Sequence, residues 1–439
     1  MATFLQDALP ASPVAFGRAA RSLFQLDPEY TNLNHGTAGA VPRYVEDASR
    51  ELDAEMSLNP DRFIWFEYRP RLEKVRAQMA TLIGAQQHEC VFVPNVSHGI
   101  NTVLRNFEWG ESDTLLITDC HFKTVTSAAQ FVRDNTHNLM LSEFKLSFPE
   151  RRSVILGRFK AHIRAIKRAQ ALHSGVTPRS TPKIVAVFDS ISAAPAVLMP
   201  WKEMVQICKD ECVWSVVDAA HSLGQEVDLD LGRVSPDFWV SSCSKWLYTK
   251  LGCAVLYVPE RNHRIIKSAF PTSLTYHGLG QSPVEHDLQF KFHWTGTLDF
   301  TPVLSIKSAL EIRSLLGGEA KINQYCHDLA MAGGRRLAEI MKTHMLYPAD
   351  DEEAEAFTAN MVNVAIPLPG SLRPSEQITL MFQDKLLNKH NVYAMQFYHN
   401  GQWWTRVSAQ IYNELKDFDI LGHALLAVCA EMAKSLSPT

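Results

Sequence analysis

The chain has 439 residues, of which 46% are hydrophobic and 21% are charged, and its formal net charge is −4. This composition is typical of a soluble globular protein with room for two or three domains. The slightly acidic balance argues against nucleic acid as a partner, and no apolar stretch is long enough to cross a bilayer. The eight cysteines form no CxxC pair and show no zinc-finger spacing, so we expect reduced thiols in a cytoplasmic protein and no metal site.

The predicted elements begin with a helix over 72–84 that ends at Gly84. Beyond it, short β-branched or aromatic runs alternate with helical stretches, which is typical of a mostly parallel sheet covered by helices. We predict strands at 91–95, 114–119, 184–189, 213–220, 238–243 and 253–259. From about residue 305 the pattern changes to helices over 305–317, 320–343 and 417–435, with strands at 361–368 and 403–408. We therefore predict an N-terminal segment over 1–30, a large domain over 31–304 and a small domain over 305–439.

Ligands of such sheets bind beyond the carboxyl ends of the strands, where an acid and a lysine occur. Asp218 ends the run VWSVVD and is followed by His221, and Lys245 comes after the next run, within SSCSKWL. An apolar setting lowers the pKa of a lysine, and a carboxylate holds a pyridine nitrogen in its protonated form. The pair is typical of pyridoxal phosphate (PLP) chemistry, in which a lysine forms a Schiff base and then acts as acid or base at Cα. For Asp218 alone, a helix cap is an equally simple interpretation.

Four motifs in one order resemble the class V aminotransferase superfamily of fold-type I PLP enzymes, in its isopenicillin N epimerase-like branch. They are DAAH (218–221), SCSKWL (242–247), WTGTLD (294–299) and RVSAQIYN (406–413). The resemblance implies an α/β architecture, with a large domain built on a mostly parallel seven-stranded sheet and a smaller α+β C-terminal domain. It also implies an amino-acid substrate and a homodimer with a shared active site.

The resemblance implies a role for each matching position. Asp218 would pair with the pyridine nitrogen, His221 would lie against the ring, and Lys245 would be the Schiff-base lysine. Arg406 would grip the substrate carboxylate through two parallel hydrogen bonds. The other cofactor-binding positions are Asn95, Ser97, His98, Gly99, Phe122, Ser192, Ser242, Ser244, Gly296 and Thr297, and the substrate loop supplies Asn34, His35 and Gly36.

Within this set, NVSHG (95–99) matches a phosphate-binding turn, in which backbone N–H groups at the start of a helix meet an anion. An ordinary helix cap is the alternative for that turn. Phe122 would stack on the cofactor ring, and Ser192 would lie near the phenolic oxygen. Thr297 would bond the phosphate in the neighbouring subunit. Relatives carry His where this chain has Ser244, so either other groups hold the phosphate or the cofactor is bound less tightly.

The sequences of the segments DPEYTNLN (27–34) and VPERN (258–262) most resemble those of the hercynylcysteine sulfoxide C–S lyases and of the PLP enzyme of loline biosynthesis. We therefore expect a C–S lyase that acts at Cα and Cβ by β-elimination, with Lys245 as acid and base. A desulfurase is disfavoured because residues 270–290 contain no cysteine to act as the nucleophile. An epimerase, an alkaloid-biosynthesis enzyme, an aminotransferase and a binding protein without turnover remain alternatives.

Overall fold

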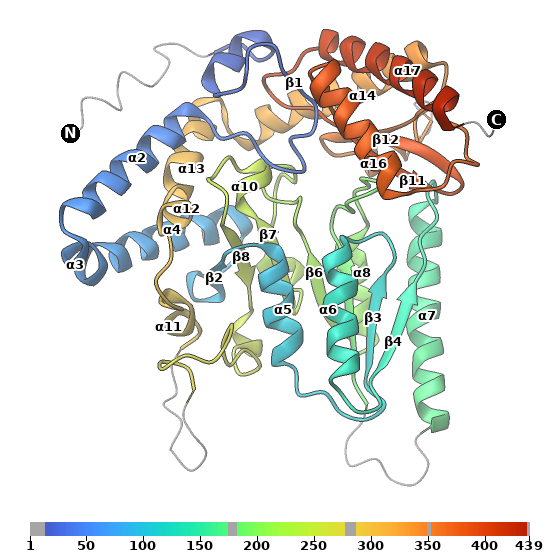
Figure 1. The fold of residues 1–439 in the computed structure, drawn as a ribbon. Coiled ribbons are helices and arrows are strands. Elements are labelled where there is room, and N and C mark those ends of the chain that lie inside the picture. Colours follow the sequence, from blue (N-terminus) through green and yellow to red (C-terminus); the bar gives the residue numbers. More distant parts are fainter. Residues whose placement is uncertain (1–13, 174–181, 277–286, 349–352, 437–439) are drawn as a thin grey trace.

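The structure, a computed structural model, describes residues 14–173, 182–276, 287–348 and 353–436. Its largest unit is a seven-stranded sheet in the order β2-β8-β7-β6-β5-β3-β4 (Figure 1). The strands are β2 (Cys90–Val93), β3 (Thr114–Thr118), β4 (Met140–Phe144), β5 (Ile184–Asp189), β6 (Trp214–Asp218), β7 (Phe238–Ser242) and β8 (Ala254–Tyr257). Five of them run parallel from β7 to β4, whereas β8 is antiparallel to both of its neighbours. The predicted mostly parallel seven-stranded sheet is confirmed.

Helices cover both faces of this sheet, and each face has its own hydrophobic core. One face carries α5 (Val96–Asn106) and α6 (Lys123–Asp134), and the other carries α4 (Tyr68–Ile83), α7 (Arg152–His173) and α8 (Trp201–Asp210). Along β6, Val216 packs into the first core and Val217 into the second, as the two-residue period of a strand requires. Because both faces are buried, these strands consist of continuous apolar runs and are easily predicted.

The edge strand β4 was not predicted from the sequence. It pairs only with β3 in the large sheet, and only Phe144 of its five side chains is buried. Its sequence, MLSEF, therefore lacks the apolar run that marks the central strands. The polar residues Ser142 and Glu143 are tolerated because one side of the strand faces no neighbour.

A second sheet of three antiparallel strands lies in the C-terminal part of the chain, in the order β11-β12-β9. Its strands are β9 (Met361–Ala365), β11 (Met395–His399) and β12 (Gln402–Ser408), and its main helices are α13 (Ile306–Leu315), α14 (Gly318–Met341), α16 (Glu376–Gln383) and α17 (Leu415–Leu436). The helices predicted over 305–317, 320–343 and 417–435 are confirmed. The edge strand β11 was not predicted, again because most of its side chains are only half-buried. The limits of the three proposed domains stay a prediction.

The described part of the N-terminal segment lies over the junction between the two sheets. It forms the short helix η1 (Arg18–Leu23), after which Phe24 packs edge-on against Tyr248 and Tyr412. Strand β1 (Thr31–Asn32) then pairs with β10 (Val392–Tyr393). The first thirteen residues of the predicted segment lie outside the described residues.

Further α-helices connect these units and carry the loops around the site. They are α2 (Arg43–Leu58), α3 (Pro60–Arg62), α9 (Leu231–Val234), α10 (Cys243–Trp246), α11 (Leu288–His293), α12 (Thr301–Leu304) and α15 (Ala354–Phe357). Within the described ranges, no helix is both long and apolar enough to span a membrane. All eight cysteines are free thiols, and Cys212 alone is exposed.

Candidate active site

A cavity of about 330 Å³ lies at the carboxyl ends of β5, β6 and β7, where the large sheet meets the small one. Met395 of β11 and Arg406 of β12 close it from the side of the small sheet. The predicted site residues that line it are Gly36, Asn95, Ser97, Phe122, Asp218, His221, Ser242, Ser244, Lys245 and Arg406. Residues from distant parts of the sequence thus meet in one place, at the strand ends where the α/β pattern predicts a ligand.

The amine of Lys245 lies next to the ring of His221. Lys245 follows β7 in the short helix α10, and its Nζ is 3.4 Å from His221 Nε2. The Trp246 indole donates to His221 Nδ1 at 3.4 Å, so the proton of the neutral imidazole is on Nε2. The amine can accept this proton once it has lost its own charge. Burial lowers the pKa of Lys245 to about 8 and the pKa of His221 well below its usual value. The lysine is therefore prepared to act as a nucleophile and base near neutral pH.

Two acids lie side by side at the strand ends. Asp218 ends β6 and is paired in register with Asp189 at the end of β5, so the two side chains lie on the same face of the sheet. Asp218 Oδ1 accepts the N–H of Ala220 at 3.0 Å. Burial raises the pKa of Asp218, and burial together with the charge of Asp218 raises the pKa of Asp189 well above its usual value. Asp189 was not predicted, although the strand-end reasoning that found Asp218 applies to it equally.

Arg406 is a buried cation whose hydrogen bonds all go to neutral groups. It donates to the Ala193 carbonyl at 2.8 Å and to Thr37 Oγ1 at 2.7 Å, with Asn34 Oδ1 at 3.4 Å. Among the described residues nothing accepts from its Nε, and no carboxylate pairs with it. Burial lowers the pKa of its guanidinium to about 10. A buried guanidinium with donors to spare suits an incoming carboxylate. Thr37 was not predicted as its partner.

The start of α5 supplies backbone donors to the cavity. The side chain of Asn95 caps this helix by accepting the N–H of His98 at 2.8 Å, whereas the N–H groups of Val96 and Ser97 have no acceptor within the helix. Asn95, Val96 and Ser97 line the cavity, whereas His98 does not. The positive end of the helix dipole therefore meets the cavity and suits a phosphate.

Two serine hydroxyls and one aromatic ring complete the lining. Ser242 Oγ and Ser244 Oγ are 3.2 Å apart, and each can donate to an oxygen of a ligand. Phe122, directly before α6, lines the cavity while 61% of its surface is exposed. An exposed aromatic ring beside a cavity is available to stack on a flat ligand.

Helix α10 is fixed from two sides. A side chain at Gly39 would collide with the carbonyl oxygens of Ser244 and Lys245, so the loop that precedes α2 lies directly against α10. On the other side the buried Arg313, which pairs with Glu319, donates to the Trp246 carbonyl at 2.8 Å. These contacts hold the backbone of the lysine in place.

The predicted residues Asn34, His35, Ser192 and Gly99 do not line the cavity, although Asn34 contacts Arg406 beside it. His35 is fully buried behind α10, where its Nδ1 lies 3.0 Å from the Tyr412 hydroxyl and burial lowers its pKa to about 3. Ser192 donates instead to the Pro195 carbonyl at 2.7 Å. Gly99 packs against the sheet, because a Cβ there would come within 2.6 Å of Val240. Their neighbours Gly36, Ile191 and Ala193 line the cavity in their place.

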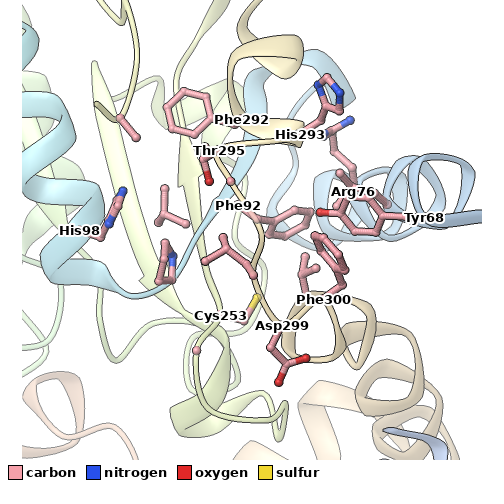
Figure 2. A pocket seen from close by; sticks show the side chains of 18 residues that line it. Tyr68, Arg76, Phe92, His98, Cys253, Phe292, His293, Thr295, Asp299 and Phe300 are labelled. Atoms are coloured by element: carbon pink, nitrogen blue, oxygen red, sulfur yellow. The ribbon is translucent and has the colours of Figure 1, made fainter. Parts of the chain in front are cut away.

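A second, smaller cavity of about 70 Å³ is lined by two further predicted residues, His98 and Gly296 (Figure 2). Thr295, Gly296 and Leu298 form part of its lining, and the side chain of His98 lies at its opposite side. Thr297 is exposed at the tip of this loop. None of the lining residues is shared with the Lys245 cavity. Within one chain, Gly296, Thr297 and the His98 ring therefore lie apart from Lys245.

The residues around Lys245 fit pyridoxal phosphate. Lys245 would carry the aldehyde carbon, Asp218 the ring nitrogen, and the start of α5 with Ser242 and Ser244 the phosphate. The unpartnered Oδ2 of Asp189 and Nε of Arg406 are buried polar atoms of the kind that a ligand satisfies.

Comparison with known proteins identifies the class. Residues 66–421 match the family model described as Aminotransferase class-V. The chain belongs to the class-V aminotransferase family, and it is a PLP-dependent enzyme of fold type I. The resemblance seen in the four motifs, and the architecture and cofactor that it implies, are confirmed.

The chain is similar to individual members of this family along nearly its whole length. The chain is 31% identical to the L-cysteine desulfhydrase-like protein lolT2 of Epichloe uncinata over 452 residues, covering 95% of each chain. It is 30% identical to the hercynylcysteine sulfoxide lyase of Schizosaccharomyces pombe, covering 94% of this chain and 98% of the relative. Among solved structures, the cystine C–S lyase C-DES in complex with cysteine persulfide superposes with a TM-score of 0.72 at 16% identity, covering 91% of this chain and 97% of the other. This last likeness shows a shared fold.

Proposed function

We propose that the protein is a PLP-dependent C–S lyase that removes a β-sulfur group from a cysteine-derived amino acid. The observation that carries the proposal is one cavity that contains Lys245, whose pKa burial lowers to about 8, together with the guanidinium of Arg406, whose Nε has no acceptor among the described residues. Similarity along nearly the whole chain to a hercynylcysteine sulfoxide lyase and an L-cysteine desulfhydrase-like protein supports a sulfur-containing substrate.

The residues of the cavity divide the work of this reaction. PLP, when bound, supplies an electron sink for the charge that develops at the substrate Cα. Arg406 holds the α-carboxylate and so fixes the direction of the Cα–H bond. Lys245 takes the Cα proton and returns a proton to the leaving sulfur. The Cα–H and Cβ–S bonds break, and water then completes the release of pyruvate and ammonia beside the sulfur product.

The reaction is tested with the PLP-loaded protein and three probes, namely cysteine, cystine and a cysteine S-conjugate sulfoxide. We expect pyruvate and ammonia in equal amounts from at least one of them, with the sulfur product released in step. An amino group passed to an added keto acid without pyruvate would instead identify an aminotransferase. Loss of optical purity with the C–S bond intact would identify an epimerase. Either result, or no turnover of any probe, contradicts the proposal.

We further propose that the protein acts as a homodimer in which the loop 294–299 of one subunit completes the cavity of the other. Thr297 and Leu298 are exposed at the tip of this loop, with 52% of the Leu298 surface accessible. Among the described residues, nothing lies within 4 Å of the place that a Cβ at Gly296 would take. The tip of the loop is thus exposed, although Trp294 and Asp299 at its ends contact Phe300 and Thr301. Its threonine hydroxyl would add a phosphate donor where Ser244 offers only a short neutral one.

Mixing of two variants tests the shared site. Thr297→Glu places a like charge beside the phosphate of the neighbouring subunit, and Lys245→Ala removes the amine, so each homodimer should be inactive. Refolding the two together should restore about a quarter of the wild-type activity, because half of the random dimers contain one intact site. A monomer on size-exclusion chromatography, or mixtures without any recovery, would rule out the shared site.

A further inference from the structure

Asp189 is a buried acid at the centre of the cavity to which the proposed reaction gives no task. Only 6% of its surface is exposed, and it lines the same cavity as Asp218 and Lys245. Its Oδ2 has no hydrogen-bond partner within the part of the chain that the structure describes. An unsatisfied buried oxygen is costly, so its retention here points to a ligand atom as the missing partner.

The charges around Asp189 favour its neutral form. Asp218 faces it from β6 and repels a second negative charge, whereas the ammonium group of Lys245 in α10 attracts it. His221 is neutral, and the Cys120 thiol, which follows β3, is held by Asp119. Arg406 is engaged with Ala193 and Thr37. If both acids were ionised, their two negative charges would exceed the one positive charge of the lysine ammonium. A phosphate dianion in the same cavity would add more negative charge.

We propose that Asp189 is a positioning residue that stays protonated and donates a hydrogen bond from its carboxyl group to an acceptor oxygen of the bound cofactor. This inference rests on the proposed function, because it needs PLP in the cavity. Asp218 and Asp189 then act in opposite ways. Asp218 serves as the charged acceptor for the ring nitrogen, and Asp189 serves as a neutral donor one strand away. The surroundings give the two carboxyl groups different protonation states, because burial and a nearby like charge favour the neutral form of an acid.

Two substitutions separate donation from charge. Asp189→Asn keeps the shape and an N–H donor but cannot ionise, whereas Asp189→Leu keeps the branched shape, in a somewhat larger side chain, without a donor. The dissociation constant of PLP from the apoprotein should stay within about threefold of wild type for Asn and rise about tenfold for Leu, the effect of one hydrogen bond. Asp119→Asn is the matched control, since Asp119 follows the neighbouring strand β3, accepts from the Leu146 N–H, and is exposed.

The apoprotein gives a second readout without cofactor. A carboxyl group with a folded pKa above its unfolded value holds a proton in the folded state that it loses on unfolding. The free energy of unfolding therefore falls as the pH rises above the unfolded value of about 3.9. Asp189→Asn should make urea-unfolding curves between pH 4 and pH 8 less dependent on pH, while the Asp119→Asn control should follow wild type.

The outcomes are distinct. If the Asn variant loses PLP affinity as much as the Leu variant does, Asp189 acts through a negative charge and the inference is wrong. Unchanged affinity in the Leu variant would likewise remove any cofactor role. Should the Leu variant fail to fold in the urea assay, the isosteric Asn variant still decides between donor and charge. A wild-type protein that binds no PLP would instead defeat the proposed function itself.

Discussion

Replacing Lys245 with alanine is expected to abolish turnover while the protein stays folded. The amine both attaches the cofactor and moves the proton at Cα, and loss of the proton transfer alone slows such reactions by about 10² to 10⁴-fold. The variant should also lack the absorbance band near the visible edge that borohydride treatment removes from the wild type. Both kcat/KM and the spectrum of the PLP-loaded protein measure the change.

The lowered pKa of Lys245 adds a pH dependence to this result. Below pH 8 the amine holds a proton, and above pH 8 it is free to attack the aldehyde, because burial sets its pKa at about 8. Capture of PLP by the wild-type apoprotein should therefore accelerate as the pH rises through 8. Lys267→Ala is the matched control, since Lys267 is exposed and pairs with Glu108 on the surface. Equal spectra for the Lys245 and Lys267 variants would contradict the assignment.

Arg406→Lys is expected to raise the KM of the amino-acid substrate by about 10- to 100-fold. The lysine keeps the positive charge but loses the planar fork, and each charged hydrogen bond to a carboxylate contributes about 1.5–3 kcal/mol. PLP affinity should remain near wild type, because Arg406 approaches from β12 and holds no part of the cofactor in our assignment. Substrate titrations and PLP titrations of the same preparation separate the two effects.

The same exchange at the surface provides the control. Arg373 is exposed and donates to the Tyr398 hydroxyl in the C-terminal part of the chain, so Arg373→Lys should leave the KM unchanged. If Arg406→Lys lowered kcat and PLP affinity together with an unchanged KM, the guanidinium would serve the cofactor rather than the substrate.

Much of the fold was predictable because the central strands are buried on both faces. Strands such as β5 and β6 are continuous apolar runs that end in Asp189 and Asp218, and the parallel order follows from the helices between them. The edge strands β4 and β11 escaped prediction for the opposite reason. Only one of the five side chains in each strand is buried, so neither strand contains the apolar run that marks a buried strand.

Site residues whose place follows from the course of the backbone could be predicted. Residues whose role depends on the direction of the side chain could not. Asp218 and Lys245 follow strand ends, so the fold itself brings them together. His35 has the same local features as a substrate-loop residue, but the turn at Asn34–Thr37 directs its ring behind α10 toward Tyr412. Only contacts between residues hundreds of positions apart determine that direction. Asp189 also ends a predicted strand, but only the register of β5 and β6 shows that it lies directly beside Asp218.

Gly39 is a position at which we expect substitutions to be harmful even though it has no chemical role. It carries no reactive group and lies in a loop some two hundred positions before the lysine, yet the carbonyl oxygens of Ser244 and Lys245 occupy the space of its missing side chain. In a survey of all single substitutions, this glycine should therefore be as intolerant as the lysine itself. A variant that keeps every polar residue of the cavity but replaces Gly39 would retain the chemical groups. It would lose the backbone position of Lys245 that brings these groups together.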